Sequence, residues 1–298
     1  MTVSGQRTFE HWKFPRPVSW TALEESGVPT AGLVFLSKQF REEKEPFRRL
    51  HLFPRDILAS ERDLIISEGV REEDLNLEVV WQDAFALVVN KPAAMKVHPN
   101  DASEQNTLLQ LLQKQYLREN NLLDRLRHIH RLDEATQGLV LFATCSYSQF
   151  VLDAMMREKQ IDRSYLAWVD GKPATVKGTI DAPIGRDRNH PTRRIVSKQG
   201  QSAVTHYEIL DHHHNRSLLR LRLETGRTHQ IRVHLKHIGI PIVNDPLYGK
   251  DAEKSIVFKS NTAMKNMKLL ADQLEFIHPW TGEMVRVEIG APDSFHLF

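Results

Sequence analysis

Short runs of apolar residues, many alternating with polar ones, dominate the chain from residue 77 onward. LEVVW and FALVVN are separated by the polar QDA, which predicts a β-hairpin over residues 77–90. SAVTHYEIL and SLLRLRLET, on either side of DHHHN, predict a second hairpin. The other segments expected to hold strands are GLVLFAT, SYLAWVDG and LEFIHPWTGEMVRVEIG, the last of them as a strand pair around a turn.

Apolar residues at helical spacing predict helices between these strands. The helical segments are NTLLQLLQKQYLREN, YSQFVLDAMMREKQ and GRTHQIRVHLKHIG, and the last is expected to end at Gly239. Strands outnumber helices, and many strands that follow one another are expected to be antiparallel. The pattern favours an α+β fold with a mixed, largely antiparallel sheet over a regular alternation of strand and helix.

Residues 1–75 differ from the rest of the chain. They are rich in charge and proline, as in FREEKEPFRRLHLFPRD, and they contain no strong series of strands. We interpret residues 1–75 as a small accessory module or extension and residues 76–298 as the main domain, a division that suits a chain of 298 residues.

Composition narrows the class of protein. A 41% share of hydrophobic residues is enough to build a substantial core. The 40 Lys and Arg against 38 Asp and Glu leave a net charge of +2, which permits a local basic face but not a uniformly basic surface. The single cysteine, Cys145, excludes an internal disulfide. With no apolar signal region and no run long enough to span a bilayer, a cytoplasmic protein is expected.

The densest polar segment, HIHRLDEATQG, directly precedes the strand segment GLVLFAT. A loop carboxylate such as Asp133 is most often a solvated turn former or a helix cap. Here it follows His128, His130 and Arg131, and nearby positive charge favours the ionised carboxylate that a nucleophile requires. Scaffolds also place catalytic groups where a strand meets a polar loop. Asp133 is therefore a candidate nucleophile.

LETGRTHQIRVHLKHIG is the second segment with candidate chemistry. Its simplest interpretation is a basic amphipathic helix, but this does not account for the TGRTHQ ahead of the helix. Gly226 permits unusual backbone angles, and Thr228 could cap the helix. Such a turn would fix the direction of Arg227, whose fork-shaped guanidinium suits a carboxylate partner.

Two further features have alternative interpretations. Tyr165 alternates with apolar residues and is by default a core tyrosine, but it could instead be an aromatic platform for a nucleobase. IGRDRNHPTRRIVSKQG is by default a solvated loop, yet its cations could contact phosphates. Those cations are Arg186, Arg188, Arg193, Arg194 and Lys198.

The histidines do not indicate a metal site. Residues 212–214 are all histidine and lie on an expected turn, so they cannot all face one centre. His234 and His237 have helical spacing but no HExxH motif or cysteine pair beside them. There is no glycine-rich phosphate loop and no GxSxG, so nucleoside triphosphate and serine-hydrolase chemistry have no support.

HRLDEATQGLVLFA resembles the signature of the large-subunit RNA pseudouridine synthases, the RluA family, whose pattern is His-Arg-Leu-Asp, two residues, Thr-Ser-Gly. Other segments match in order over roughly residues 78–290: VVNKPAAMKVHP, RSYLAWVDG, IGRD, SAVTHYEIL, LETGRTHQIRVHLKHIGIPIVNDPLYG and LEFIHPWTGE. Three positions depart from the family pattern. Gln137 replaces the usual Ser, Ala94 the usual Gly and Leu270 the usual His.

The resemblance implies that residues 76–298 are a catalytic domain with a pseudouridine synthase fold and a central cleft. It also implies that the protein is an isomerase that converts specific uridines of rRNA or tRNA to pseudouridine. By this resemblance Asp133 is the nucleophile or ion-pair stabiliser and Arg227 is its partner. Tyr165 would stack on the target base and serve the proton transfer at carbon 5. The reaction involves no redox step and no net hydrolysis, so no cofactor, metal or ATP is expected.

The expected partner is RNA, with no membrane contact and a monomeric state. Charge and position make Arg131 and the cationic loop candidates for phosphate contacts that offset the cost of flipping the base out of its stack. The complete set of expected RNA-binding residues is Arg131, His130, Thr136, Arg186, Arg193, Arg194, Lys198, His229 and Arg232.

Two other classes of function compete with this interpretation. A catalytically silent RNA-binding or ribosome-assembly protein could keep the same fold, although binding alone would not need Asp133, Tyr165 and Arg227. A glycosidase using Asp133 and Glu134 is disfavoured, because adjacent residues on a strand point in opposite directions. Direct attack by Asp133 and elimination to a glycal both remain open.

Overall fold

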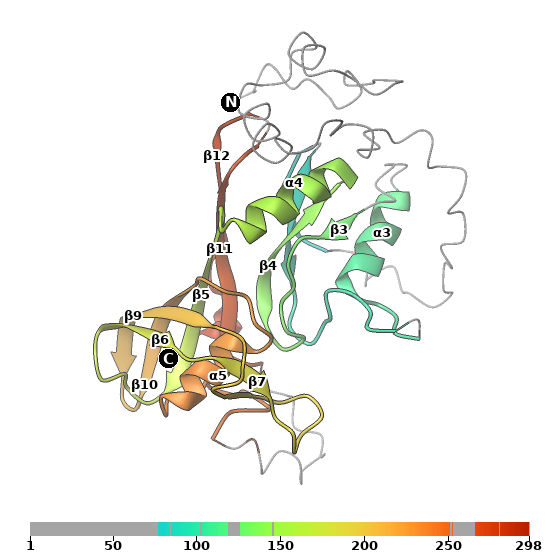
Figure 1. Cartoon of the computed structure of the whole chain (residues 1–298). Coiled ribbons are helices and arrows are strands. Elements are labelled where there is room, and N and C mark those ends of the chain that lie inside the picture. The colour runs from blue at the N-terminus through green and yellow to red at the C-terminus, as the bar shows by residue number, and fades with distance from the viewer. Residues whose placement is uncertain are drawn as a thin grey trace.

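The computed structural model describes residues 77–297 except for 84, 102, 119–125, 145, 251, 253–265 and 280. The expected accessory module of residues 1–75 and Cys145 therefore lie outside the described residues. The described chain is built on a long sheet with helices packed against it (Figure 1). The helices discussed here are α3 (Leu108–Arg118), α4 (Ser146–Arg157) and α5 (Gln230–His237), and a short 3-10 turn, η4 (Asp293–Phe295), lies near the C-terminus.

The main sheet has ten strands in the order β1-β2-β4-β11-β5-β10-β9-β6, with β12 paired to β11 and β3 paired to β4. Their bounds are β1 (Val79–Gln82), β2 (Ala86–Lys91), β3 (Arg127–His128), β4 (Gln137–Ala143), β5 (Ile161–Asp170), β6 (Lys177–Asp181), β9 (Val204–His213), β10 (Arg216–Leu223), β11 (Leu269–Ile277) and β12 (Met284–Glu288). Among the described strands β4 and β11 pair in parallel and the other pairs are antiparallel. The expected α+β fold with a mixed sheet is confirmed.

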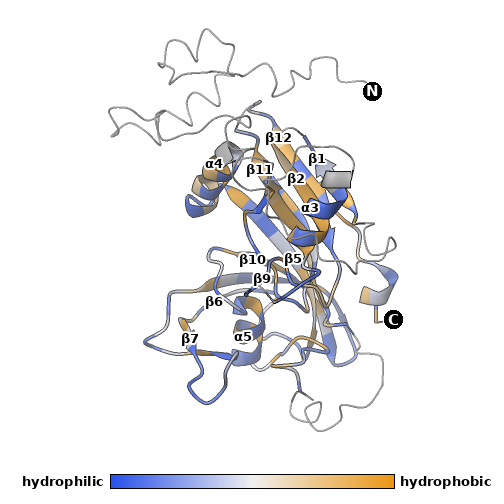
Figure 2. Cartoon of the chain, turned by 90° about the vertical axis from the view of Figure 1, so that its right-hand side faces the viewer, coloured by the Kyte–Doolittle hydropathy of each residue, from blue (hydrophilic) through white to orange (hydrophobic). Residues whose placement is uncertain are grey.

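The central strands are covered on both faces. In β4, Val140 and Phe142 join an apolar cluster that also contains residues of α3 and α5. Leu139 and Leu141 of the same strand join a second cluster that contains residues of α4. Burial on both faces explains why GLVLFAT is a continuous apolar run and not an alternating one. Figure 2 shows this apolar character around β2 and β11.

Both expected hairpins are present, since β1 pairs with β2 and β9 with β10 in antiparallel register. The cationic segment predicted to be a loop contains a small hairpin of its own. Its strands are β7 (Ile184–Arg186) and β8 (Arg194–Val196), which pair with each other as a separate sheet.

The start of α5 also differs from the prediction. His229 stands at the N-cap with a left-handed φ of 60°, and no side chain caps the helix. Thr228 is therefore one residue too early to act as the cap. Its hydroxyl oxygen instead accepts a hydrogen bond from the Nη2 of Arg131 at 3.3 Å.

Gly138 marks the point where β4 meets β11. Its φ is +116°, and a Cβ there would lie 2.3 Å from the carbonyl oxygen of Ala271. The Gly138→Ala variant combines backbone strain with a clash against backbone, so we expect it to lower the free energy of unfolding by about 3–5 kcal/mol. Gly290→Ala is the matched control, because a Cβ at Gly290 has nothing within 4 Å. Equal urea midpoints for the two variants would contradict this account of the β4–β11 junction.

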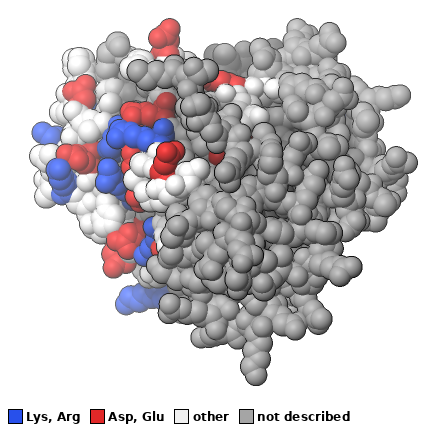
Figure 3. Space-filling model, turned by 90° about the horizontal axis from the view of Figure 1, so that it is seen from above, with Lys and Arg blue, Asp and Glu red and all other residues white. Residues whose placement is uncertain are grey.

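The surface carries charges of both signs. In the view from above, acidic and basic side chains of the described residues are interspersed (Figure 3). None of the helices that the structure describes combines the length and the hydropathy needed to cross a bilayer.

Candidate active site

Asp133 lies in the loop between β3 and β4. Its backbone carbonyl accepts a hydrogen bond from the N–H of Thr136 at 3.0 Å, which closes a turn. On the other side of Asp133, the N–H of Leu141 donates to the Nε2 of His130 at 3.2 Å. Burial lowers the pKa of His130, so the ring is a neutral acceptor. The turn and the histidine fix the backbone on both sides of Asp133.

Lys91, at the end of β2, supports the same loop. Its side chain is buried, and its Nζ donates to the carbonyl oxygens of Pro92 at 2.9 Å, Met95 at 2.7 Å and Glu134 at 3.2 Å. Three acceptors match the three N–H groups of an ammonium. Burial lowers the pKa of Lys91 to about 7, while the charges of Asp133 and Glu134 act in the opposite direction. Lys91 thereby joins the turn at residues 92–95 to the Asp133 loop.

The Lys91→Met variant keeps an unbranched side chain one atom shorter than lysine but leaves three carbonyl oxygens without a donor. We expect it to lower the free energy of unfolding by about 2–4 kcal/mol and to reduce activity, because the loop that carries Asp133 loses its support. Urea unfolding measures the first effect. The control is Lys172→Met, since Lys172 is exposed and also precedes a proline. A Lys91→Met protein as stable as the control would show that the three bonds do not hold the loop.

Arg232, on the buried face of α5, is the ion-pair partner of Asp133. Its Nη1 donates to the Oδ2 of Asp133 at 2.9 Å, and its Nε and Nη2 each donate to the carboxylate of Asp245 at 2.8 Å. The side chain of Arg232 is 5% exposed and that of Asp133 is 23% exposed. Burial alone would lower the pKa of Arg232, but Asp245 and Asp133 outweigh it and the pKa is raised. Arg232 is therefore a permanently charged bridge between two carboxylates.

Asp245 fixes the direction of this arginine. It also accepts hydrogen bonds from the N–H groups of Leu247 at 2.9 Å and Tyr248 at 3.0 Å, and the guanidinium of Arg232 lies 5.0 Å from the ring centre of Tyr248. The Oδ1 of Asp133, in contrast, receives no hydrogen bond from any described residue. One oxygen of the carboxylate is held and the other is left available to a substrate.

Arg227 does not make the ion pair that the sequence suggested. Its Nε donates to the carbonyl oxygen of Ser202 at 3.0 Å, and the residue is exposed. Its backbone N–H donates to the Oε1 of Gln230 at 3.0 Å, which fixes the turn before α5 with Arg227 directed toward the start of β9. Arg232 lies within the helix and faces the loop, so Arg232 takes the position beside Asp133.

His229 also approaches Asp133, with its Nε2 at 3.9 Å from Oδ2. Its Nδ1 lies 2.8 Å from the hydroxyl of Tyr248, and that hydroxyl accepts a hydrogen bond from the N–H of Arg194 at 2.8 Å. We assign the Tyr248 hydroxyl as the donor to Nδ1 of His229, an assignment that puts the N–H of the neutral ring on Nε2, facing Asp133. Burial lowers the pKa of His229, so the ring is neutral at pH 7.

Asp133, Arg227, His229 and Arg232 line a cleft of about 610 Å³, a volume in the range of small-molecule sites. Tyr165 reaches it from β5 and is only 4% exposed. Burial raises the pKa of Tyr165, so its phenol is protonated at neutral pH. Six Arg and Lys side chains line the cleft against three carboxylates, which favours an anionic ligand.

A family model described as RNA pseudouridylate synthase matches residues 86–237. The chain belongs to this family. Its members are isomerases that act on RNA, and the RluA-family resemblance is confirmed.

Bacterial and human proteins are among the relatives of this pseudouridine synthase. It is 40% identical over 239 residues to the uncharacterized RNA pseudouridine synthase YhcT of Bacillus subtilis. The aligned region covers 80% of this chain and 74% of the relative. This chain is 37% identical over 257 residues to the ribosomal large subunit pseudouridine synthase D of Pseudomonas aeruginosa, covering 82% and 79%. The solved structure of human RNA Pseudouridylate Synthase Domain Containing 1 matches with a TM-score of 0.59 and 25% identity over 75% of this chain and 87% of that one.

The structure divides the residues expected to bind RNA into two groups. One group lines the cleft of this synthase with Asp133: Arg131, His130, Thr136, His229 and Arg232. The other group belongs to the β7–β8 region, where Arg186 and Lys198 are exposed and Arg193 and Arg194 line a separate hollow of about 510 Å³. Two residues of the first group have little surface with which to contact RNA, since His130 is 7% exposed and Thr136 is 2% exposed.

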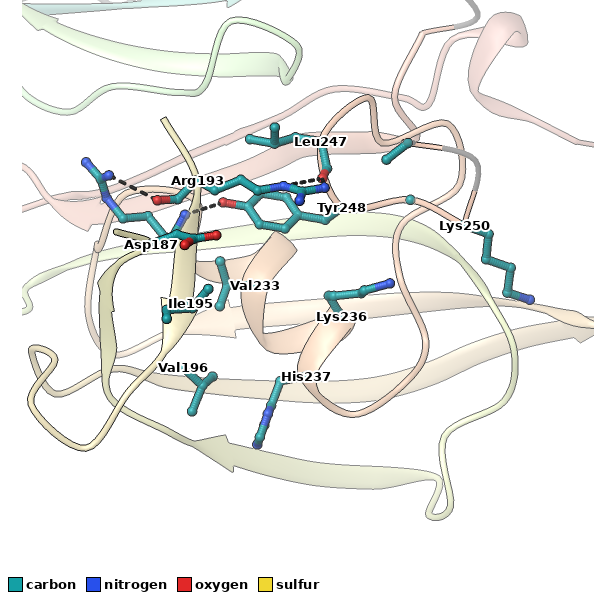
Figure 4. Close-up of a pocket in the computed structure, with 13 residues that line it drawn as sticks. Asp187, Arg193, Ile195, Val196, Val233, Lys236, His237, Leu247, Tyr248 and Lys250 are labelled. Atoms are coloured by element: carbon teal, nitrogen blue, oxygen red, sulfur yellow. Dashed lines mark hydrogen bonds between the residues drawn. The ribbon is translucent and has the colours of Figure 1, made fainter. Parts of the chain in front are cut away.

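Arg193 has a structural partner in that second hollow. Figure 4 shows its guanidinium turned toward the carbonyl oxygen of Leu247, to which Nε donates at 3.1 Å and Nη2 at 2.7 Å. The neighbouring Arg194 N–H meets the hydroxyl of Tyr248. These bonds attach the β7–β8 hairpin to the segment that orients Arg232, and they leave Arg193 with less capacity for a phosphate.

Sequence reasoning missed Asp245, Lys91 and Tyr248 as parts of the site. Asp245 begins DPLYG, and an Asp before such a turn signals a side chain bonded to the following backbone N–H groups. That signal was available for Asp245. A lysine with no charged partner gives no comparable sign in sequence, so the burial of Lys91 could not be found that way.

The three departures from the family pattern have structural counterparts. Gln137 and Leu270 are direct partners in the parallel β4–β11 register, and both are buried, at 9% and 1% exposure. Ala94 adopts a φ of 59°, the left-handed region in which glycine carries no strain. None of the three makes a hydrogen bond or ion pair with the side chain of Asp133, Tyr165 or Arg232.

The histidines of the β9–β10 hairpin have other partners. The Nδ1 of His212 lies 3.0 Å from the hydroxyl of Ser217, and the rings of His213 and His214 meet edge to face. Within the part of the chain that the structure describes, no group of three His, Cys, Asp or Glu side chains is placed to hold a metal ion.

Proposed function

We propose that this synthase isomerises specific uridines of structured RNA, with large-subunit ribosomal RNA as the first candidate substrate, and that Asp133 is the nucleophile. The observation that carries the proposal is the asymmetric carboxylate of Asp133. Its Oδ2 is held by Arg232 at 2.9 Å, while its Oδ1 is free of hydrogen bonds to described residues in a cationic cleft. The choice of RNA rests on relatives named as ribosomal large subunit pseudouridine synthase D.

The geometry suits displacement at the anomeric carbon of ribose. Oδ1 of Asp133 would attack C1′ as the bond from C1′ to N1 of uracil breaks, and the displaced uracil would carry the electron pair. The base then turns, C5 forms the new bond to C1′, and Asp133 leaves. The proton on C5 is lost and N1 gains one, so atoms and charge balance. Elimination from C2′ to a glycal would use the same carboxylate as a base.

Arg232 and Tyr165 have supporting roles in this proposal. Arg232 aims the carboxylate and offers a fixed positive charge close to the reacting centre. The raised pKa of Tyr165 keeps the phenol protonated. It therefore fits a role as a wall for the base and a hydrogen-bond donor better than a role as the base that removes the C5 proton.

The target nucleotide must leave its stack to enter the cleft. Flipping costs a few kcal/mol, which contacts to phosphate and base must offset. Arg131 suits such a contact, since it is exposed at the cleft and its Nη2 is anchored on Thr228. Arg186 and Lys198 on the β7–β8 hairpin would extend the contact along the RNA.

The test is a mapping experiment with the full-length protein. Unmodified transcripts of large-subunit ribosomal RNA, small-subunit ribosomal RNA and transfer RNAs are incubated with it, and pseudouridine is mapped by carbodiimide treatment and primer extension. New pseudouridine in large-subunit RNA supports the proposal. Product confined to transfer RNA would contradict the substrate, and tight binding without product in any RNA would indicate a catalytically silent RNA-binding protein.

A further inference from the structure

Arg163 also lines the cleft, but the roles proposed for Asp133, Arg232 and Tyr165 do not involve it. It lies on β5 two residues before Tyr165, so both side chains project from the same face of the sheet. Both residues line the cleft. Arg163 is half-buried, which places its charge beside the reacting groups and not on the outer surface.

Arg163 makes no hydrogen bond or ion pair with any described residue. Its Nε is buried without a hydrogen-bond partner, whereas its two Nη atoms retain some solvent-accessible surface. Of the other five cations of the cleft, Arg157 is exposed and the remaining four have acceptors from the protein. Arg232 has two carboxylates, Lys159 has Glu224 at 3.3 Å, Arg227 has the carbonyl of Ser202, and Arg131 has the hydroxyl of Thr228.

Gly226 lies beside the guanidinium of Arg163 and has no side chain that could cover it. A Cβ at this position would lie 3.7 Å from both Nη1 and Nη2 of Arg163. The glycine thus leaves both ends of the fork uncovered. A planar fork with two open Nη groups matches two oxygens of one anion.

A half-buried guanidinium without a counter-ion is unfavourable, and none of the described residues supplies a carboxylate to Arg163. The charge affects its surroundings, since it acts to lower the pKa values of both Tyr165 and His130. Uracil and ribose are neutral, so the anionic groups that an RNA substrate brings into the cleft are its phosphates. Building on the proposed function, we propose that Arg163 binds a phosphate next to the target uridine and so anchors that nucleotide beside Asp133.

The first test measures RNA affinity against salt, in the full-length protein with Asp133→Asn added to prevent turnover. The probe is an unmodified transcript of large-subunit ribosomal RNA. Arg163→Gln should weaken binding about tenfold to a hundredfold and reduce the slope of log K against log salt by about 1. An unchanged slope would overturn the proposal.

Arg222→Gln is the matched control. Arg222 is exposed and pairs across the β5–β10 ladder with Ser164, so its side chain is on the face of the sheet opposite Arg163. Arg222→Gln removes the same charge as Arg163→Gln, from a strand of the same sheet. Equal loss of slope in the two variants would show a general effect of net charge and would also overturn the proposal.

The second test locates the phosphate. A stem-loop containing the uridine mapped in the activity experiment is made with a neutral methylphosphonate on its 5′ or 3′ side. Wild-type affinity should fall at one of the two positions, and Arg163→Gln should be insensitive at that same position. A merely structural role for Arg163 predicts additive losses, which would overturn the assignment.

The two proposals can fail separately. If the wild-type protein makes no pseudouridine but the salt slope still falls in Arg163→Gln and not in Arg222→Gln, the reaction is wrong and the phosphate site stands. If pseudouridine forms normally and the slope is unaffected, the reaction stands and the role of Arg163 falls.

Discussion

Asp133→Asn should reduce the rate of pseudouridine formation by about 10⁴-fold or more, because an amide cannot replace the attacking carboxylate. The fold should survive the change. Arg232 keeps both bonds to Asp245, and the oxygen of the introduced amide can still accept from Nη1. We expect the free energy of unfolding to change by no more than about 2 kcal/mol, with RNA affinity close to that of the wild type. Single-turnover assays on the mapped RNA measure the rate.

Glu134→Gln is the control for this variant. It removes the same charge one residue later, and the residue is exposed. Near wild-type turnover is expected, because the contact of Glu134 with Lys91 uses its backbone carbonyl and not its side chain. Turnover by Asp133→Asn at the control's rate would refute the assignment of the nucleophile.

Arg232→Met should be the most damaging single substitution for stability in the site. It leaves two carboxylates without their shared cation, one of them on the fully buried side chain of Asp245. Breaking a buried ion pair from one side costs about 3–5 kcal/mol. Turnover should fall as well, because Asp133 loses the group that aims it. Urea unfolding and single-turnover assays measure the two effects.

Arg227→Met compares the two arginines directly. Arg227 is exposed and loses a single bond to the carbonyl of Ser202, so about 1 kcal/mol or less is expected. Arg232→Lys adds a second comparison, since one ammonium cannot reproduce a fork that serves Asp133 and Asp245 together. If Arg227→Met abolished activity and Arg232→Met left stability intact, the pairing seen here would not be the one that works in solution.

The sequence predicted the strands, the helices and the location of Asp133 because these depend on local patterns. The apolar run of β4 and the polar segment before it are each contained within a few residues. Local patterns do not show whether Arg227 or Arg232 pairs with Asp133. The pairing depends on the left-handed backbone of His229, which sets where α5 begins and which side chains face the Asp133 loop.

Lys91 and Asp245 illustrate the same limit. Lys91 acts through three carbonyl oxygens, and a carbonyl is present at every residue, so no pattern of side chains reveals its partners. Asp245 could be predicted to form a turn, but not to hold an arginine 13 residues earlier. Contacts of this kind appear only when the sheet brings distant segments together.

The ion pair of Asp133 and Arg232 joins residues 99 positions apart. Closing such a long loop has an entropic cost, so we expect this pair to form late in folding. During synthesis the Asp133 loop leaves the ribosome well before α5 and Asp245, so a nascent chain that ends before α5 has the carboxylate without its counter-ion. On the proposed role of Asp133 as the nucleophile, we expect activity to begin only after Asp245 has joined the fold, so the emergence of Asp133 and the onset of activity are separate events.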